Sequence, residues 1–592
     1  MKLLIAQTNI LFYLHRYTNV VNIAFLMSII RQFSRRKTNF NTSGDHQLKR
    51  VLSVRDLTFF GVAAIIGGGI FSSVGEACAS GGPGVIWLFI LCAVACGFAA
   101  LCYAEFAARI PVSGSAYTYA YASFGELFAW VIGWALIMEY SIGNIYIAFS
   151  WSGYFTHLLE SMNINIPQWL TIDYATANRI FTNGIVDSEN KEAIHAIAAW
   201  QTSPVIGGLH IIFDAPAVLI NAVITLLVFR GIHESRRASN LMVILKIVII
   251  VAVILVGAFY IDIDNFEPFN PSGVKGIMAG VSAVFFTYIG FDAISTLAEE
   301  SKNPERDLPK GMFYSLIICT LLYILISLVL TGMVPFDLLN VDDPLAFALE
   351  YKGIHWLEYI VTVSAIIAMT SVLLVFQMGQ PRIWMSMSRD GLLPNKFSTI
   401  HPKFKTPGFS TIVTGFVVGL PIFFTDEKFV LDFTSIGTIF AFVLVCGGVL
   451  LLPKRKKGEG KGFRLWYING KWLFPALVAV SILILFLSGV ATSSIPGGYS
   501  YLDDLLYGYS VPEFYNSHRA MWLLLFILSV LSYIKKLNLI PLLGVSICSY
   551  LLTGMSADNW KWFGLWFLLG LVIYFVYGFR NSKLGIVGNE KT

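Results

Sequence analysis

The segment Ile65-Ile66-Gly67-Gly68-Gly69-Ile70-Phe71 lies in the middle of an apolar stretch that is long enough to cross a lipid bilayer as a helix. Three successive glycines weaken this helix, each by about 1 kcal/mol relative to alanine. Inside a membrane, a broken helix is tolerated only where its backbone lines a cavity or packs on protein. The break would free N–H groups at the start of the second half-helix, and these groups, together with the helix dipole, would form a site for a carboxylate. Close helix packing through small residues explains the same glycines equally well.

A second predicted span, at 275–300, contains a comparable interruption. It reads Phe285-Phe286-Thr287-Tyr288-Ile289-Gly290-Phe291-Asp292-Ala293, so Gly290 lies close to a carboxylate in mid-span. Free carbonyl groups at such a break can accept hydrogen bonds from an ammonium group. Two interrupted spans, five helices apart, are typical of transporters built from inverted repeats. The alternative is a glycine in an aromatic packing surface, with Asp292 capping a helix end.

The composition places both segments in a membrane protein. Hydrophobic residues make up 56% of the 592 residues and charged residues 13%, whereas a soluble domain carries roughly 25% charged residues. The charges collect in short patches between long apolar runs, which predicts an all-α integral membrane protein with about fourteen transmembrane helices. The predicted spans are 54–79, 86–110, 126–158, 211–231, 238–261, 275–300, 311–334, 356–388, 407–425, 430–452, 472–493, 519–534, 538–554 and 560–579.

The distribution of lysine and arginine predicts the orientation of these spans. Basic clusters fall in alternate loops, whereas the loops between them are acidic or neutral. The positive-inside rule then places both termini in the cytoplasm of a multi-pass protein of the cell membrane, plasma or inner. Residues 1–50 are predicted to be a cytoplasmic tail, with Met27 as an alternative start. The long segments 161–209 and 496–518 fall on the outside.

Charged residues inside apolar spans are costly and usually functional. Lys246 lies in the fifth span, roughly 10 Å along the helix from Ser239 at 1.5 Å per residue, so its amino group could extend to the cytoplasmic surface. If Lys246 cannot reach water, it becomes a candidate for proton exchange. Glu139 lies deeper, in the third span, and is a candidate pocket carboxylate. Glu105 precedes Arg109 by four residues and is expected to form an ion pair with it.

Other function classes find no support in the sequence. There is no Walker A sequence and no paired metal-ligand motif, and no strand precedes the glycines at 67–69, so we expect no cofactor and no enzyme activity. The net charge of +5 is not gathered in a soluble basic domain, which argues against nucleic-acid binding. No obligate protein partner is evident. The seven cysteines lie in or beside apolar runs and are interpreted as buried hydrophobic residues.

Several motifs, taken in order, resemble the amino acid–polyamine–organocation superfamily of permeases, and within it the cationic amino acid transporter branch. The resemblance extends from about residue 48 to about residue 584, and each motif alone is weak whereas the ordered set is specific. The matching positions are 67–71, 111–117, 139–140, 151–154, 290–293, 299–304, 379–382 and 387–391.

This resemblance implies a five-plus-five inverted-repeat core, as in leucine-transporter-like folds, followed by four extra C-terminal helices. The core would occupy 51–453, with repeat one at about 54–261 and repeat two at about 275–452. The additional helices would occupy 454–584, and a cytoplasmic tail would follow at 585–592.

The resemblance also implies a substrate geometry. The α-carboxylate would bind backbone amides of the first break, and the α-amino group would bind carbonyls of both breaks. The residues expected around the substrate are Ile65, Ile66, Gly67, Gly68, Gly69, Ile70, Glu139, Phe286, Thr287, Ile289 and Gly290. Phe286 and Asp292 would act in gating. Lys246 matches the fifth-span lysine that takes the place of a sodium ion in proton-coupled members. The family often has alanine or threonine where this chain has Gly68, so the pocket lacks one side chain.

The sequence thus predicts a permease that takes up an amino acid together with a proton by alternating access. One alternative is amino-acid exchange without net proton flux. Another, from a different class, is a membrane receptor or sensor that binds an amino acid without moving it.

Overall fold

The computed structural model describes residues 52–110, 115–183, 191–231, 236–271, 273–341, 343–452, 463–493 and 512–584. Three predicted features lie outside these residues: the N-terminal tail with its alternative start at Met27, most of the second outer segment (496–511), and the C-terminal tail at 585–592.

The described chain is helical apart from one short hairpin. The helices before this hairpin are α2 (Val54–Ile65), α3 (Val74–Gly81), α4 (Val85–Arg109), α5 (Ser115–Ser123), α6 (Glu126–Ser161), α7 (Tyr174–Asn183) and α8 (Lys191–Thr202). The hairpin pairs β1 (Val205–Ile206) with β2 (Leu209–His210) in antiparallel register. The central helices are α9 (Ala215–Arg230), α10 (Arg236–Gly257), α11 (Gly273–Ala279), α12 (Val281–Phe286), α13 (Pro304–Met333), α14 (Pro344–Tyr351), α15 (His355–Arg389), α16 (Gly408–Gly419) and α17 (Glu427–Leu451). The last are α18 (Gly470–Ser493), α20 (Pro512–Lys535), α21 (Leu539–Thr553), α22 (Ala557–Ile573) and α23 (Phe579–Asn581).

Each predicted span contains helix. Among the described residues, seven helical stretches are long and apolar enough to cross a membrane. They are 69–109, 126–161, 240–260, 304–333, 355–389, 427–451 and 557–581, and six shorter apolar helices accompany them. The protein is therefore an all-helical membrane protein, whereas the count of fourteen crossings and the inverted repeat stay predictions.

Local sequence signals explain where several helices begin. Ser53 and Asp56 form a capping box that starts α2. At the start of α9, the side chain of Asp214 accepts a hydrogen bond from the backbone N–H of Ala217. At the start of α17, the side chain of Asp426 accepts one from the backbone N–H of Phe429. These side chains satisfy N–H groups that the helix itself leaves without a partner.

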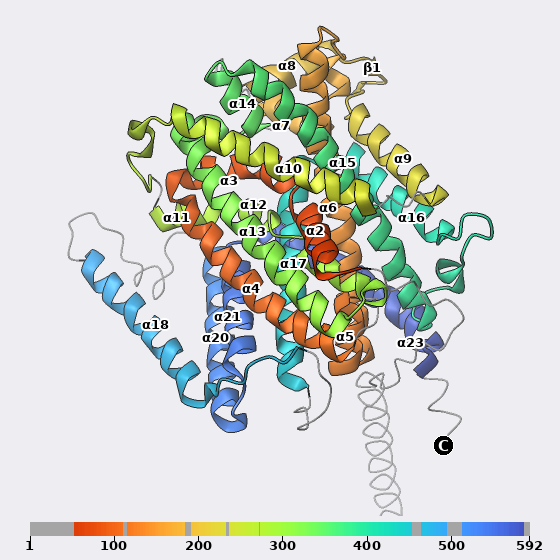
Figure 1. The fold of residues 1–592 in the computed structure, drawn as a ribbon, viewed down its shortest axis with the longest axis vertical. Coiled ribbons are helices and arrows are strands. Elements are labelled where there is room, and N and C mark those ends of the chain that lie inside the picture. Colours follow the sequence, from red (N-terminus) through yellow and green to blue (C-terminus); the bar gives the residue numbers. More distant parts are fainter. Residues whose placement is uncertain are drawn as a thin grey trace, which may run out of the picture.

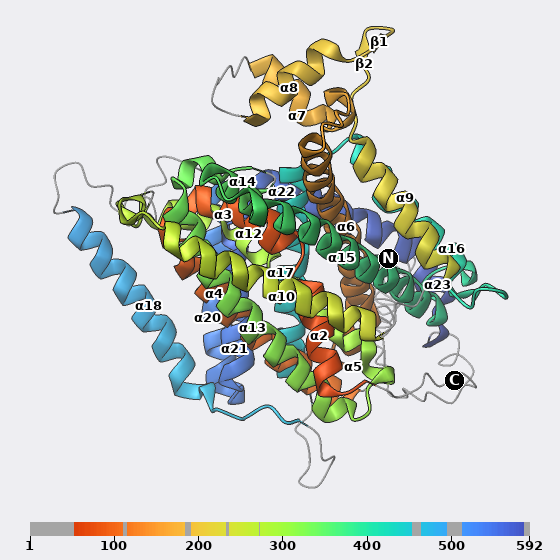
Figure 2. The same cartoon turned by 45° about the horizontal axis from the view of Figure 1, so that its top comes forward.

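The longest helices form the centre of the molecule. α6 packs along α15 and α17, and α4 and α2 pack against α13 (Figures 1 and 2). α6 is buried along most of its length, so its side chains meet protein rather than lipid. The C-terminal helices lie around this centre: α18 packs on α20, α21 packs on α17 and α4, and α22 packs on α6 and α17.

The first predicted outer segment folds into a small unit at the end of α6. It contains α7, α8 and the hairpin, which project from the helical body at the top of Figure 2. The unit has a hydrophobic core of its own, separate from the main one, formed by Ile172, Ala177, Ile180, Ala193, Ala196, Ala199 and Ile212.

Candidate functional site

The first glycine segment interrupts a helix, as its composition predicts. α2 ends at Ile65, and Ile66 leaves the helix with φ −79° and ψ 96°. A π-helical turn, η1 (Gly69–Ser73), then leads into α3. The carbonyl of Gly67 accepts bonds from the N–H groups of Ile70 and Phe71, both at 3.2 Å. Among the loop and cap hydrogen bonds of the described residues, none is donated by the three successive glycines. The N–H groups of these glycines therefore lie at the start of the second half-helix, where a helix leaves its first donors without partners.

The second interruption follows α12. Residues 287–290 form turns, and a 3₁₀ helix, η6 (Phe291–Glu300), continues the chain. Gly290 has φ +113°, which side-chain-bearing residues rarely adopt. A Cβ atom on Gly290 would lie 2.9 Å from the carbonyl oxygen of Ala64 in α2. Only glycine therefore allows the second break to lie against the end of α2.

The two breaks touch each other. A Cβ atom on Gly69 would lie 2.7 Å from the Cα atom of Thr287, so the two backbones are separated by little more than the glycine hydrogens. Close packing, which the sequence left as an alternative to helix breaking, occurs at the breaks themselves.

Tyr323 on α13 joins the two breaks. Its buried hydroxyl lies 3.1 Å from the carbonyl oxygen of Ile65 and 2.7 Å from that of Thr287. A single O–H group is thus shared between the carbonyl at the C-terminus of α2 and the carbonyl at the C-terminus of α12. Nothing in the sequence singles out this residue, because a tyrosine in an apolar span is ordinary.

Tyr323→Phe is expected to raise the KM for substrate by roughly fivefold to a hundredfold, because leaving buried carbonyls without a donor costs about 1–3 kcal/mol. Initial uptake rates in proteoliposomes would measure this change. Tyr314→Phe on the same helix is the matched control, because Tyr314 is 48% exposed. Equal KM values for the two variants would show that the Tyr323 hydroxyl is dispensable.

Lys246 reaches the first break from α10. Its Nζ donates hydrogen bonds to the carbonyl oxygens of Ile66 at 3.2 Å and Ala368 at 3.1 Å, and to the hydroxyl of Ser371 at 2.6 Å. Lys246 is 1% exposed, so its amino group stays inside the protein instead of extending to the surface. The three N–H donors of an ammonium group match these three acceptors. A protonated Lys246 therefore ties the end of α2 to α15.

Two aromatic rings lie against the breaks. The ring of Phe286, the last residue of α12, meets the ring of Tyr146 on α6 edge to face, with centroids 4.5 Å apart. Gly68 faces the same tyrosine, because a Cβ there would lie 3.3 Å from its ring. The glycine that replaces a side chain at this position thus leaves room for Tyr146.

Glu139 and Asp292 form a buried pair of carboxylates. They are 2% and 1% exposed, they interact electrostatically, and Thr438 lies within hydrogen-bonding reach of Glu139. The Asp292 carboxylate also receives bonds from backbone N–H groups around Gly290, as in a helix cap. One oxygen of each carboxylate has no hydrogen-bond partner.

The structure brings together most of the residues singled out in the sequence. The first break contacts both the second break and Lys246, and Phe286 is the residue directly before the second break. The expected carbonyl acceptors at Ile65 and Ile66 already receive bonds from Tyr323 and Lys246. Tyr323, Tyr146 and Ser371 are the contributors that sequence reasoning missed.

Two interrupted helices that share one buried junction, joined by the hydroxyl of Tyr323 and with a buried lysine bound to the first of them, define a membrane transporter of the broken-helix class. Residues 52–511 match the protein family described as "Amino acid permease", and residues 537–582 match the family described as the C-terminus of AA_permease. The chain belongs to the amino acid permease family, within the cationic amino acid transporter branch of the amino acid–polyamine–organocation superfamily.

Individual relatives agree with this family. Branched-chain amino acid permease BcaP of Bacillus subtilis is 39% identical over 78% of this chain and 92% of its own length. The methylthioribose transporter of the same organism is 39% identical, over 75% and 94%. Cationic amino acid transporter 4, vacuolar, of Arabidopsis thaliana is 31% identical, over 91% and 94%. The resemblance derived from the ordered motifs is confirmed, as is the expectation of a membrane transporter rather than an enzyme.

Proposed function

We propose that this protein is a secondary active permease that takes up an amino acid together with a proton by alternating access. The observation that carries the proposal is the position of Lys246, whose amino group binds the carbonyl of Ile66 at the first break and two acceptors on α15. Gain or loss of one proton on this group would change the connection between two helices at the substrate site.

The proposed cycle follows from these contacts. With a proton on Lys246, the ammonium group holds the end of α2 against α15. Loss of the proton removes a donor and the charge, so at least one of the three acceptors loses its partner. The end of α2 is then free to move relative to α15. Such a change links the protonation state to the accessibility of the site.

The backbone of the two breaks fits the common part of every amino acid. The buried N–H groups at the start of η1 and the dipole of that half-helix favour a carboxylate. The buried pair Glu139 and Asp292 offers oxygen atoms to an ammonium group or to a second proton. The names of the relatives include a branched-chain and a cationic amino acid, so both side-chain classes are candidate substrates here.

The test is uptake into proteoliposomes that contain the purified full-length chain. Labelled L-leucine and L-arginine are offered with and without an inward proton gradient, in competition with the common amino acids and with methylthioribose, which lacks an α-carboxylate. We expect accumulation that the gradient increases and that amino acids inhibit. Inhibition by methylthioribose alone would refute amino acids as substrates.

The same vesicles separate the alternatives. An exchanger would accumulate label only when unlabelled substrate is present inside, and the proton gradient would have no effect. A receptor or sensor would bind the amino acid in detergent but would not move it into the vesicle.

A further inference from the structure

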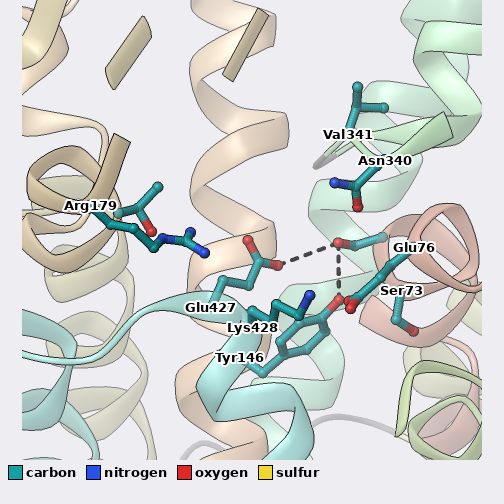
Figure 3. A pocket seen from close by; sticks show the side chains of 10 residues that line it. Ser73, Glu76, Tyr146, Arg179, Asn340, Val341, Glu427 and Lys428 are labelled. Atoms are coloured by element: carbon teal, nitrogen blue, oxygen red, sulfur yellow. Dashed lines mark hydrogen bonds between the residues drawn. The ribbon is translucent and has the colours of Figure 1, made fainter. Parts of the chain in front are cut away.

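A polar cavity of about 160 Å³ lies beyond the aromatic pair, on the side that the charge distribution predicts to be outside the cell. It begins at Ser72 of η1, three residues along the chain from Gly69 (Figure 3). One water molecule needs roughly 15 Å³ on this scale, so the cavity has room for a small organic solute.

Tyr146 forms the boundary between this cavity and the two breaks. Its hydroxyl lies 3.2 Å from the hydroxyl of Ser72 and lines the cavity, whereas its ring packs on Phe286. A solute in the cavity is therefore separated from the breaks by the same pair of rings that is expected to act in gating.

The cavity is lined by two acidic and two basic side chains. Glu76 comes from α3 and Glu427 from the start of α17, while Arg179 comes from α7 of the outer unit and Lys428 follows Glu427. In Figure 3 the guanidinium group of Arg179 extends toward Glu427. Side chains of both signs therefore line the same cavity, which complements the two charges of a zwitterion.

Glu427 links the cavity to the transport core. Its Oε1 accepts hydrogen bonds from Ser150 of α6 at 3.1 Å and from Ser72 at 3.5 Å. A ligand that binds Glu427 would therefore act on a side chain that joins α17 to α6 and to the half-helix at the first break.

We propose that this cavity is an outer subsite that binds the zwitterionic head group of an amino acid before the molecule passes Tyr146 and Phe286. Arg179 and Lys428 hold the α-carboxylate, since a guanidinium group pairs with a carboxylate through two hydrogen bonds. Glu76 and Glu427 hold the ammonium group. This inference rests on the proposed amino-acid transport.

A structural ion pair is the competing role for Arg179. Burial, with a smaller contribution from nearby Asp426, raises the pKa of Asp173 to about 6, while hydrogen bonds from Thr176 and the charge of Arg179 oppose this rise. Arg179 therefore contributes to the electrostatics at the base of the outer unit. A test of the subsite has to distinguish this stabilising effect from substrate binding.

The distinguishing measurement compares two faces of the membrane with the variant Arg179→Gln. Uptake of L-leucine and L-arginine is measured in right-side-out and in inside-out vesicles of cells that express the full chain. We expect the KM in right-side-out vesicles to rise about tenfold, which equals about 1.4 kcal/mol, with Vmax retained. The KM in inside-out vesicles is expected to stay at the wild-type value, and Arg179→Lys is expected to recover part of the loss.

Lys352→Gln is the matched control, because it removes a positive charge from the same predicted face without lining the cavity. A KM for Arg179→Gln that equals the wild-type value on both faces would overturn the subsite. An equal rise on both faces, or an equal rise for Lys352→Gln, would overturn it as well, because a general structural or surface-charge effect predicts that result. Wild-type vesicles that accumulate neither probe would instead refute the proposed function, and the subsite with it.

Discussion

Lys246→Ala is expected to abolish the stimulation of amino-acid uptake by an inward proton gradient and to lower the initial rate at least about tenfold, equal to about 1.4 kcal/mol. The substitution removes the proton-exchanging group and leaves buried acceptors on Ile66, Ala368 and Ser371 without this donor. Each unsatisfied buried group costs about 1–3 kcal/mol, so the first break would also lose its fixed position against α15. Uptake of labelled L-leucine, with the gradient and after its collapse by a protonophore, measures the effect.

Two further variants separate charge from proton exchange. Lys246→Arg keeps a positive charge that cannot be removed, so it should bind the acceptors in part and still lose gradient dependence. Lys310→Ala, at the start of α13, is the control for loss of a lysine and should keep full stimulation. Elution from a size-exclusion column shows whether each variant folds. Stimulation that persists in Lys246→Ala would exclude this lysine as the coupling group, and the pair of Glu139 and Asp292 would take its place as the candidate.

The positions of both breaks could be predicted from the sequence because they depend on local properties. Successive glycines at 67–69 weaken any helix, whatever surrounds them. Gly290 is also a local signal, since its φ of +113° suits glycine. Membrane spans are equally local, because length and hydropathy decide them. Each predicted span accordingly contains helix, interrupted at the two breaks.

The connections between the breaks could not be predicted in the same way. Tyr323 and Ser371 contribute through the rotation of α13 and α15 about their own axes, and hydropathy does not determine that rotation. The sequence does not determine the direction of the Lys246 side chain for the same reason. The position of a residue along a helix does not say which neighbouring helix its side chain faces. The charged cavity is lined by side chains from α3, α7 and α17. These helices are far apart in the sequence, so no single motif predicts the cavity.

Gly69→Val is expected to eliminate measurable substrate binding, weakening it at least about a hundredfold, or about 2.8 kcal/mol. A Cβ atom at Gly69 would lie 2.7 Å from the Cα of Thr287, a backbone atom that cannot rotate away. The two breaks would have to separate, and the N–H groups of η1 would leave their positions beside the second break. Overpacking of this kind costs about 1–3 kcal/mol even where the fold adapts.

Gly69→Ala tests the same contact with the smallest possible addition and should retain part of the affinity only if the breaks can shift slightly. Gly97→Val on α4 is the matched control, since a Cβ at Gly97 meets no atom within 4 Å. Binding of labelled L-leucine and L-arginine to the purified variants is the measurement, with elution volume as the check on folding. If Gly69→Val bound a free amino acid as tightly as Gly97→Val, the substrate would have to lie elsewhere. The contact between Gly69 and Thr287 would then be ordinary helix packing, and the interruption of the two helices would need another explanation.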